Sequence, residues 1–343
     1  MTVLLLSLLL ALSAPLAAQP KAVFYMNAET GALRSFLLHG EKIDPIIPVT
    51  YLANEQGLVR GAPDPPMLEV ARKHQVPVMP IVVNPGFRQP VIHALLNDPT
   101  ARTRLAQELL EQCRRHGLYG IQFDFEQIPA ADRDAFSALV RETAGVLGAG
   151  GYKLSVAVMY QLPDEAVRSD YGRWLNDNWL AAYDLRELAK YADFLSVMTY
   201  DQHTERTPPG PIAALPWVRQ ALDVCLRLAP AQKLSLGIPL YGRRWFAGAK
   251  GGEGAVATAT LKAPEAVLLA EQMHTITQWD REDRAPWFSF YRDGLREYVF
   301  YNDARSFHER YDLARGQKLH GFSAWVLGAE DPAIWTDLPV ARR

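Results

Sequence analysis

The sequence has few or none of the features typical of disulfide-rich, nucleic-acid-binding, metal-binding or nucleotide-binding proteins. It contains two cysteines, Cys113 and Cys225, too few for a scaffold built on disulfides. Both fall in predicted helices; a disulfide is allowed in an oxidising compartment, but two buried thiols are favoured. The formal net charge is −2, which gives no basic face for nucleic acid or an anionic membrane. The eight histidines lack metal-ligand spacing, and no phosphate-binding glycine loop is present, so we expect no metal or cofactor.

One apolar run, residues 3–12, stands at the N-terminus and is followed by the small residues Ser13-Ala14-Pro15-Leu16-Ala17-Ala18. This order is typical of a secretory signal peptide, although the leading segment has no Lys or Arg. The run is too short to span a bilayer, so we expect no membrane span. We predict cleavage after Ala18 and a secreted or periplasmic protein, with residues 1–18 as signal and 19–343 as one domain.

Strand-like and helix-like segments alternate along the remaining chain. The strand-like segments are residues 22–27, 46–52, 76–84, 119–126, 153–158, 194–200, 233–241 and 321–327. Eight strands separated by helices predict an α/β fold, the closed (β/α)₈ or TIM barrel. Residues 243–315 are too many for one crossover and contain further strand-like runs. We therefore predict a small β-rich insertion between barrel strands 7 and 8.

The fourth strand, Gly120-Ile121-Gln122-Phe123-Asp124-Phe125-Glu126, delivers a pair of carboxylates to one face. Side chains alternate along a strand, so the polar Gln122, Asp124 and Glu126 point into the barrel, while their apolar neighbours point outward. Catalytic groups of such barrels lie at the carboxyl ends of strands. A Glu in a half-apolar mouth has a raised pKa and can act as a general acid. Alone, the pair is equally compatible with two solvated acids on a structural strand.

Other predicted strand ends bring polar and aromatic residues to the same face. The candidate substrate-binding residues are Gln122, Asp201, Trp325, Tyr241, Met198, Asn84 and Tyr25, and the candidate catalytic residues are Glu126, Asp124 and Tyr200. Trp325 can form a floor for a sugar ring, and Tyr200 can donate a hydrogen bond to a carbonyl. Each Tyr or Trp taken alone is more often core filling.

These motifs resemble glycoside hydrolase family 18. The last two acids of that family's DxxDxDxE strand match Asp124 and Glu126, its Met-x-Tyr-Asp motif matches Met198, Tyr200 and Asp201, and Trp325 matches its eighth-strand Trp. Further segments are most similar to the branch of spore-cortex-lytic N-acetylglucosaminidases. These segments are residues 198–203, 208–217, 236–242, 301–306 and 325–328.

The resemblance implies a glycosidase acting on β-linked N-acetylglucosamine glycans, either peptidoglycan or chitin, by substrate-assisted retention. Glu126 then protonates the glycosidic oxygen, the substrate's acetamido oxygen attacks the anomeric carbon, and Asp124 and Tyr200 hold the acetamido group. We expect a monomer without cofactors. Two alternatives stay open: a non-catalytic carbohydrate-binding protein, and an envelope scaffold whose barrel is vestigial.

Two positions depart from the family pattern, because Tyr119 and Gln122 stand where its first two acids would be. Gln122 can donate a hydrogen bond to Asp124 but cannot take up a proton, so we expect an altered pH profile. Tyr119 is expected to fill space deeper in the barrel. The family's third-strand Ser-x-Gly-Gly is also replaced, by the residues that end in Asn84.

Overall fold

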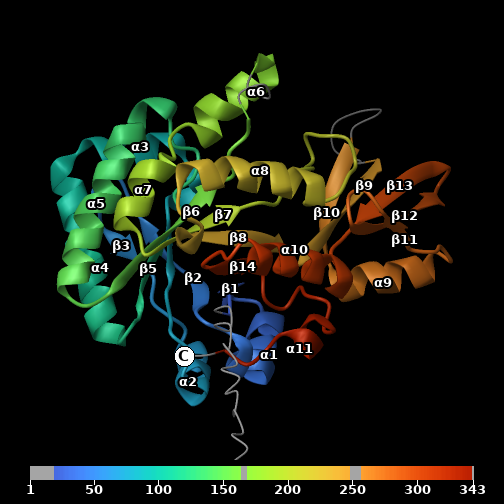
Figure 1. Cartoon of the computed structure of the whole chain (residues 1–343), viewed down its shortest axis with the longest axis horizontal. Coiled ribbons are helices and arrows are strands. Elements are labelled where there is room, and N and C mark those ends of the chain that lie inside the picture. Colours follow the sequence, from blue (N-terminus) through green and yellow to red (C-terminus); the bar gives the residue numbers. More distant parts are fainter. Residues whose placement is uncertain (1–18, 164–167, 248–255, 342–343) are drawn as a thin grey trace, which may run out of the picture.

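Eight parallel strands close into a barrel (Figure 1). The computed structural model describes residues 19–163, 168–247 and 256–341, so the expected signal peptide lies outside it. The order β1-β14-β8-β7-β6-β5-β4-β2 is closed by pairing of β1 with β2, which confirms the predicted (β/α)₈ barrel. These strands are β1 (Lys21–Met26), β2 (Ile46–Ala53), β4 (Ile81–Val83), β5 (Gly120–Phe123), β6 (Lys153–Met159), β7 (Phe194–Met198), β8 (Leu234–Pro239) and β14 (Gly321–Trp325). A short β3 (Val59–Arg60) pairs antiparallel with β2.

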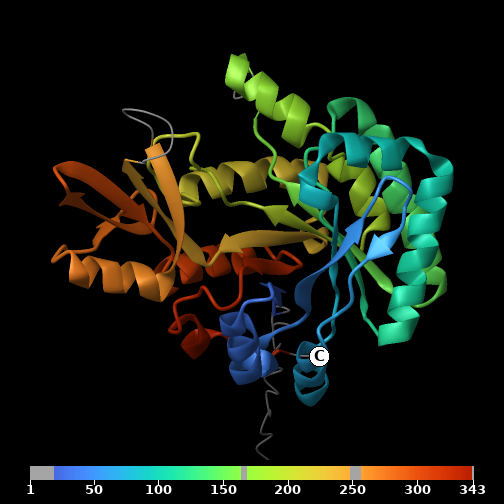
Figure 2. The same ribbon diagram turned by 180° about the vertical axis from the view of Figure 1, so that it is seen from behind.

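Helices surround these strands, as Figures 1 and 2 show from opposite sides. They are α1 (Thr30–His39), α2 (Pro65–His74), α3 (Gln89–Asn97), α4 (Pro99–His116), α5 (Arg133–Ala149), α7 (Leu185–Tyr191), α8 (Leu215–Leu228), α10 (Ala304–Gly316) and the short α11 (Ile334–Asp337). α4 is capped at its start by Asp98, which accepts a 2.8 Å hydrogen bond from the N–H of Thr100, and at its end by Gly117 with φ +61°. The outward residues of β5, Ile121 and Phe123, are fully buried in the main hydrophobic core, together with helix residues such as Phe136.

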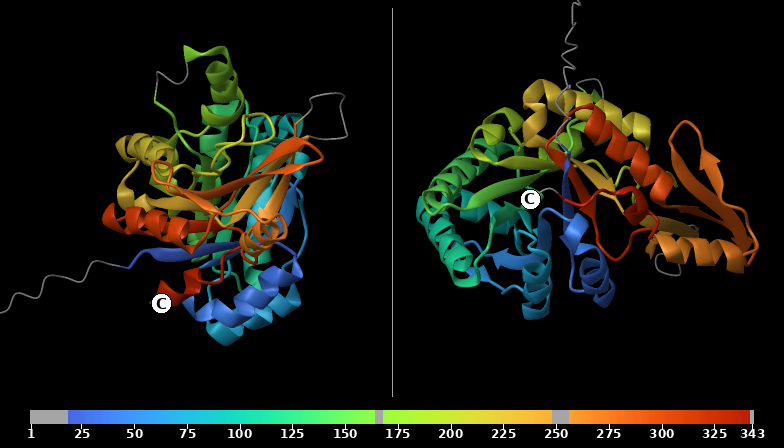
Figure 3. Two further views of the ribbon diagram at one scale, coloured as in Figure 1. Left: turned by 90° about the vertical axis from the view of Figure 1, so that its right-hand side faces the viewer. Right: turned by 60° about the horizontal axis from the view of Figure 1, so that its bottom comes forward.

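The predicted β-rich insertion lies between β8 and β14. It comprises β9 (Tyr241–Ala247), β10 (Val256–Lys262), α9 (Ala263–Gln272), β11 (Gln278–Asp280), β12 (Ala285–Arg292) and β13 (Leu295–Phe300). Its strands form one antiparallel sheet in the order β10-β9-β13-β12-β11, which stands at one side of the barrel (Figure 3). Phe288, Val299 and Ala266 give this sheet and α9 a small core of their own.

A second excursion leaves the barrel between β6 and β7. Here α6 (Asp170–Leu175) continues directly into a π-helical turn, Asn176–Leu180. We call these residues, 170–180, the α6 arm. α6 projects from the barrel in Figure 1 and in the left view of Figure 3.

Two smaller predictions are also answered. Cys113 on α4 and Cys225 on α8 are both buried and unpaired, so the two-thiol interpretation is confirmed. Across the three described ranges, no helix combines the length and apolarity needed to cross a membrane.

Candidate active site

The carboxylate segment begins where β5 stops. β5 ends at Phe123, three residues earlier than predicted, because its backbone partners then change from a strand to a side chain. The N–H of Asp124 still donates to the carbonyl of Val82 at 2.9 Å. Two residues later, the Asn84 amide accepts from the N–H of Glu126 and donates to its carbonyl, both at 3.1 Å. Asn84 is fully buried. It therefore holds Glu126 in place and does not reach the surface, contrary to its predicted substrate contact.

A second clamp acts on the residue between the two acids. The hydroxyl of Tyr183, which precedes α7, donates a 2.7 Å hydrogen bond to the carbonyl of Phe125. Tyr183 is buried, and Phe125 is fully buried in the hydrophobic core. The segment from Asp124 to Glu126 is thus fixed on both sides although it has left the strand ladder. Sequence reasoning missed Tyr183, because it reaches Phe125 only after the chain has passed through the α6 arm.

Burial changes the ionisation of both acids. Asp124 is only 6% exposed, and burial raises its pKa to about 7. The pKa of Glu126 is raised by burial first, and then by the charges of Asp124 and Asp201. Removing a carboxylate from water favours its protonated form, and neighbouring negative charges act in the same direction. Both effects favour the protonated form of Glu126, which is the form that a general acid needs.

Tyr200 lies just beyond the end of β7 and supplies a hydroxyl. It is half-buried, and burial together with nearby Tyr25 and Asp124 raises its pKa well above the usual range, so it remains a protonated donor. The preceding residue, Thr199, is fully buried and donates a 2.8 Å hydrogen bond to the carbonyl of Gly237 on β8. This bond fixes the turn that presents Tyr200.

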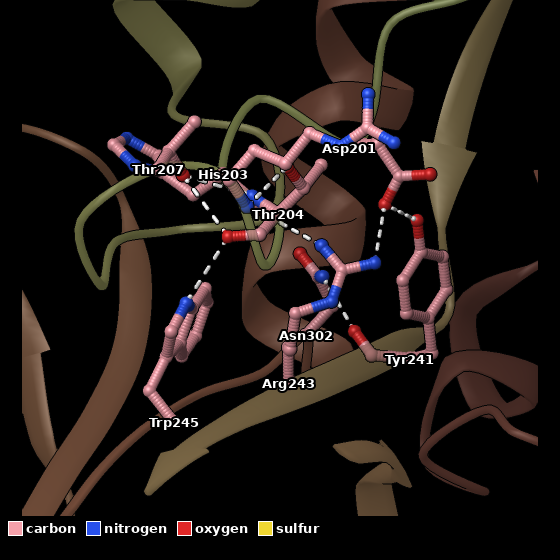
Figure 4. Close-up of polar contacts among 9 residues, drawn as sticks. Asp201, His203, Thr204, Thr207, Tyr241, Arg243, Trp245 and Asn302 are labelled. Carbon is pink, nitrogen blue, oxygen red and sulfur yellow. Dashed lines mark hydrogen bonds and ion pairs between the residues drawn. The ribbon is translucent and has the colours of Figure 1, made fainter. Parts of the chain in front are cut away.

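Asp201 is held by the insertion (Figure 4). Its backbone adopts φ +56°, a region that Asp tolerates better than most residues. One carboxylate oxygen accepts from the Tyr241 hydroxyl at 2.6 Å and from the Arg243 guanidinium at 2.9 Å. Arg243 also donates to the carbonyl of His203. Tyr241 and Arg243 occupy alternate positions on β9, which places both side chains on one face. That spacing was the available signal for Arg243, which sequence reasoning missed.

The loop after Asp201 is anchored further along the same strand. The indole N–H of Trp245 donates to the carbonyl of Thr204 at 3.2 Å, and the Asn302 amide donates to the carbonyl of Tyr241 at 2.9 Å (Figure 4). The insertion thus positions the β7–α8 loop. The hydroxyl proton of Tyr241 is already donated to Asp201.

Gln122 lies below the acids, fully buried. Its amide nitrogen donates to the hydroxyls of Ser155 at 2.9 Å and Ser196 at 3.1 Å. The expected hydrogen bond from Gln122 to Asp124 is therefore wrong in this structure. Within the described residues, Gln122 Oε1 and Asp124 Oδ1 have no hydrogen-bond partner. The Ser196 hydroxyl is in turn hydrogen-bonded to the hydroxyl of Ser323 at 2.9 Å.

Two other tyrosines depart from expectation. Tyr25, on β1, is buried beneath Trp325 with ring centroids 5.3 Å apart, so it supports the site from below. Tyr119 is 44% exposed and lines a groove with His116 and Arg72. It lies at the start of β5, and a space-filling role inside the barrel is therefore wrong.

Two clefts meet at the mouth of the barrel and share Asp201 and Arg243. One, of about 380 Å³, contains Glu126 with Met198, Tyr200 and several aromatic residues. The other, of about 490 Å³, contains Trp325 with Tyr241 and Lys262. Among the predicted residues, Glu126, Met198, Tyr200, Asp201, Tyr241 and Trp325 line one or both clefts, whereas Asn84, Gln122, Asp124 and Tyr25 are buried and line neither. No group of three or more His, Cys, Asp or Glu side chains among the described residues has a metal-binding arrangement.

Comparison with known proteins agrees with this geometry. A family model described as glycosyl hydrolases family 18 matches residues 66–330. YdhD of Bacillus subtilis is 31% identical over 243 residues, which cover 71% of this chain and 54% of YdhD. A cortical fragment-lytic enzyme of Bacillus subtilis is 29% identical over 290 residues, which cover 83% of this chain and 65% of that enzyme. The chain thus spans between about half and two thirds of the length of these two relatives.

A solved structure shows the same fold over nearly the whole chain. The crystal structure of a chitinase from Chromobacterium violaceum superposes with a TM-score of 0.83 at 25% identity. The superposition covers 94% of this chain and 100% of that one.

Proposed function

This chain belongs to glycosyl hydrolase family 18, and we propose that it cleaves β-linked N-acetylglucosamine glycans by substrate-assisted retaining hydrolysis with Glu126 as acid and base. The family match and the cortical fragment-lytic relative confirm the resemblance to the family and to its spore-cortex-lytic branch. One observation carries the proposed mechanism: Glu126 lines a cleft while its backbone is clamped by Asn84 and burial raises its pKa.

The proposed reaction has two steps, and its protons balance. In the first, Glu126 gives its proton to the glycosidic oxygen as the bond to the anomeric carbon breaks. The substrate's own acetamido oxygen attacks that carbon and forms an oxazolinium ion. In the second, ionised Glu126 takes a proton from water as the water oxygen adds to the anomeric carbon and opens the oxazolinium ring. The anomeric configuration is retained, and Glu126 regains its proton.

Asp124 and Tyr200 are proposed to hold the acetamido group. Asp124 lies two residues before Glu126, and its buried Oδ1 has no hydrogen-bond partner among the described residues, so the acetamido N–H must enter below the cleft surface to donate to it. Its negative charge stabilises the developing positive charge on the acetamido nitrogen. Tyr200 keeps its hydroxyl proton and can donate to the acetamido oxygen. Trp325, in the adjoining cleft, provides a ring on which the donor sugar can stack.

A peptidoglycan-type glycan is the proposed substrate, since the matched enzyme of Bacillus subtilis is named as cortical fragment-lytic. Chitin is the second candidate, because the similar solved structure is a chitinase. Digestion of purified sacculi and of chitin side by side, with mass analysis of the products, separates these candidates. Products from chitin alone would overturn the peptidoglycan assignment.

A Glu126→Gln variant tests the mechanism against the carbohydrate-binding alternative. We expect wild type to hydrolyse a fluorogenic N-acetylglucosaminide or a chito-oligosaccharide. We expect the variant to lose about 10²–10⁴-fold in rate, the usual contribution of a general acid–base group. Equal turnover by both proteins would remove Glu126 from the mechanism. Binding without turnover by wild type would favour a non-catalytic carbohydrate-binding protein.

We also propose export and a monomeric state. N-terminal sequencing of protein recovered from an expressing cell's exterior or periplasm should begin after Ala18 if the apolar leader is a cleaved signal. Sedimentation should give one chain's mass, about 38.4 kDa before cleavage of the leader.

A further inference from the structure

The α6 arm exposes aromatic rings that the reaction described above does not use. Tyr171 is 56% exposed and Trp174 is 43% exposed, both on the same short helix. Their ring planes differ by 24° and their centroids lie 6.0 Å apart, so the two rings stack on each other. Contiguous exposed apolar side chains are one mark of a ligand or partner contact.

This surface is continuous with the catalytic cleft. Tyr171, Trp174 and the half-buried Trp179 line the same cleft of about 380 Å³ as Glu126. Tyr160 also lines this cleft. Its ring packs against Trp217 in an edge-to-face contact, with 4.7 Å between the ring centroids. The cleft that contains the proton donor therefore also carries aromatic residues, three of them on the arm.

The base of the arm is joined to the segment that carries the acids. Leu180 is buried in the core at the end of the π-helical turn. Its carbonyl accepts from the Gln161 amide at 3.4 Å, and the next carbonyl, that of Ala181, accepts from Arg133 at 3.4 Å. Tyr183, three residues beyond Leu180, makes the hydrogen bond to Phe125 described above. The arm is thus placed relative to Glu126 by direct contacts.

The positions of the two clefts indicate on which side of the scissile bond the arm lies. Trp325, the proposed floor for the donor sugar, lines the other cleft, and the two clefts meet at Asp201 and Arg243. A glycan lying across both clefts has its donor sugar near Trp325. The portion that departs after protonation by Glu126 then lies towards the arm.

We propose that Tyr171 and Trp174 of the α6 arm form the binding surface for sugar rings on the leaving-group side of the scissile bond. The inference rests on the proposed function, because it takes Glu126 as proton donor and Trp325 as donor-sugar floor. The chemistry fits a pyranose, whose C–H face packs on aromatic rings while its hydroxyls meet polar groups. Glu205 and Arg206, from the β7–α8 loop, line the same cleft and supply such groups.

Trp174→Ala tests the proposal on two substrates that differ in their leaving segment. The first is an N-acetylglucosamine hexasaccharide or solubilised peptidoglycan strands, whichever wild type cleaves. The second is the N-acetylglucosamine disaccharide oxazoline, which has no leaving segment. We expect kcat/KM to fall about tenfold on the first substrate, equivalent to about 1.4 kcal/mol. On the oxazoline we expect kcat/KM to stay within about twofold of wild type.

Matched variants exclude a general loss of structure. Tyr291→Ala removes a 70% exposed aromatic side chain from β12, outside both clefts, and should leave both substrates unaffected. Tyr171→Ala should repeat the selective loss, and Trp174→Phe should restore part of it. Near-wild-type melting temperatures of the variants check that they fold.

The possible failures are distinguishable. If wild type cleaves neither glycan nor oxazoline, the proposed function fails. If wild type cleaves both and Trp174→Ala and Tyr171→Ala leave glycan cleavage unchanged, the arm does not bind the leaving segment and the proposal is overturned. Equal losses on both substrates would likewise assign the arm a structural role.

Discussion

Burial of Asp124 sets up a conflict between function and stability that an Asp124→Asn variant can measure. The pKa of this carboxyl is raised from 3.8 to about 7 in the folded protein. The unfolded chain therefore loses the proton first as pH rises, while the folded chain still holds it. Where the unfolded state binds fewer protons than the native state, stability falls with increasing pH. Wild type should accordingly lose stability between about pH 4 and pH 7 through Asp124. Asp124→Asn should lack this contribution while keeping the one from Glu126, whose pKa burial also raises.

The expected size follows from the shift. A change of about three pKa units at 1.36 kcal/mol per unit amounts to about 4 kcal/mol once pH exceeds the folded-state pKa. At pH 5 the unfolded carboxyl is already mostly ionised, and the cost is about 2 kcal/mol by the same linkage. Asp124→Asn should therefore gain about 2–3 kcal/mol relative to wild type between pH 5 and pH 8. The same change should sharply reduce hydrolysis, because the carboxylate proposed to orient the acetamido group is gone.

Urea unfolding at pH 5 and pH 8 is the assay, with the free energy of unfolding taken for each variant at each pH. Asp223→Asn, which alters an exposed carboxylate on α8, is the matched control and should follow wild type. Parallel pH dependence of wild type and Asp124→Asn would refute the reasoning. It would mean that Asp124 ionises in the folded protein as readily as in the unfolded chain.

Three further outcomes are expected. Gln122→Asp should move the acidic limb of the pH–rate profile to higher pH, since a second carboxylate on the same face of the strand favours the protonated form of Asp124. An unchanged profile would show that the two positions are electrically independent. Asn84→Ala should lower both melting temperature and kcat, because two backbone groups of Glu126 lose partners at about 1–3 kcal/mol each; a loss of neither would exclude the clamp. Burial raises the pKa values of Cys113 and Cys225 to about 12, so both thiols should react with a thiol reagent at pH 8 only after unfolding. Rapid labelling of the folded protein would contradict their burial.

The barrel was predictable because its strands repeat a two-residue pattern and its helices carry clear end signals. The ends of the strands were less predictable. The alternation of Gln122, Asp124 and Glu126 continues without a break, yet β5 stops at Phe123. Beyond that residue, the Asn84 side chain takes the place of a neighbouring strand's backbone. A pattern of apolar and polar residues cannot reveal such a replacement, since the partner lies 42 residues away in the sequence.

The candidate site divides in the same way. The strand-end rule led to Glu126 and Tyr200 because both follow apolar strands directly. Arg243 was missed because it gains its partner Asp201 only when the insertion folds back over the β7–α8 loop. The α6 arm was missed because its helix is short and its aromatic residues face a cleft instead of the core, so no apolar stripe marks it.

The interior of the barrel explains why the acid pair can be accommodated here. Barrels of this class usually fill their interior with layers of bulky branched side chains. Here the inward positions of four neighbouring or facing strands carry Ser155, Ser196, Ser235 and Ser323, all buried. The hydroxyl of Ser323 lies 2.9 Å from that of Ser196 and 2.7 Å from that of Ser235, and Gln122 joins the chain through two of the serines.

This polar layer contributes little apolar burial, so the stability of β5 must come from its outward side, where Phe123 and Phe125 stack at 5.0 Å in the core. The layer does something that branched side chains could not. Hydroxyls can donate or accept, so the serines can meet the Gln122 amide in either orientation. In this structure the amide nitrogen of Gln122 faces Ser155 and Ser196, and its Oε1 has no hydrogen-bond partner among the described residues. The replacement of a family acid by Gln122 therefore leaves a neutral side chain below Asp124, which adds no charge to the acid pair and is held by the serines instead.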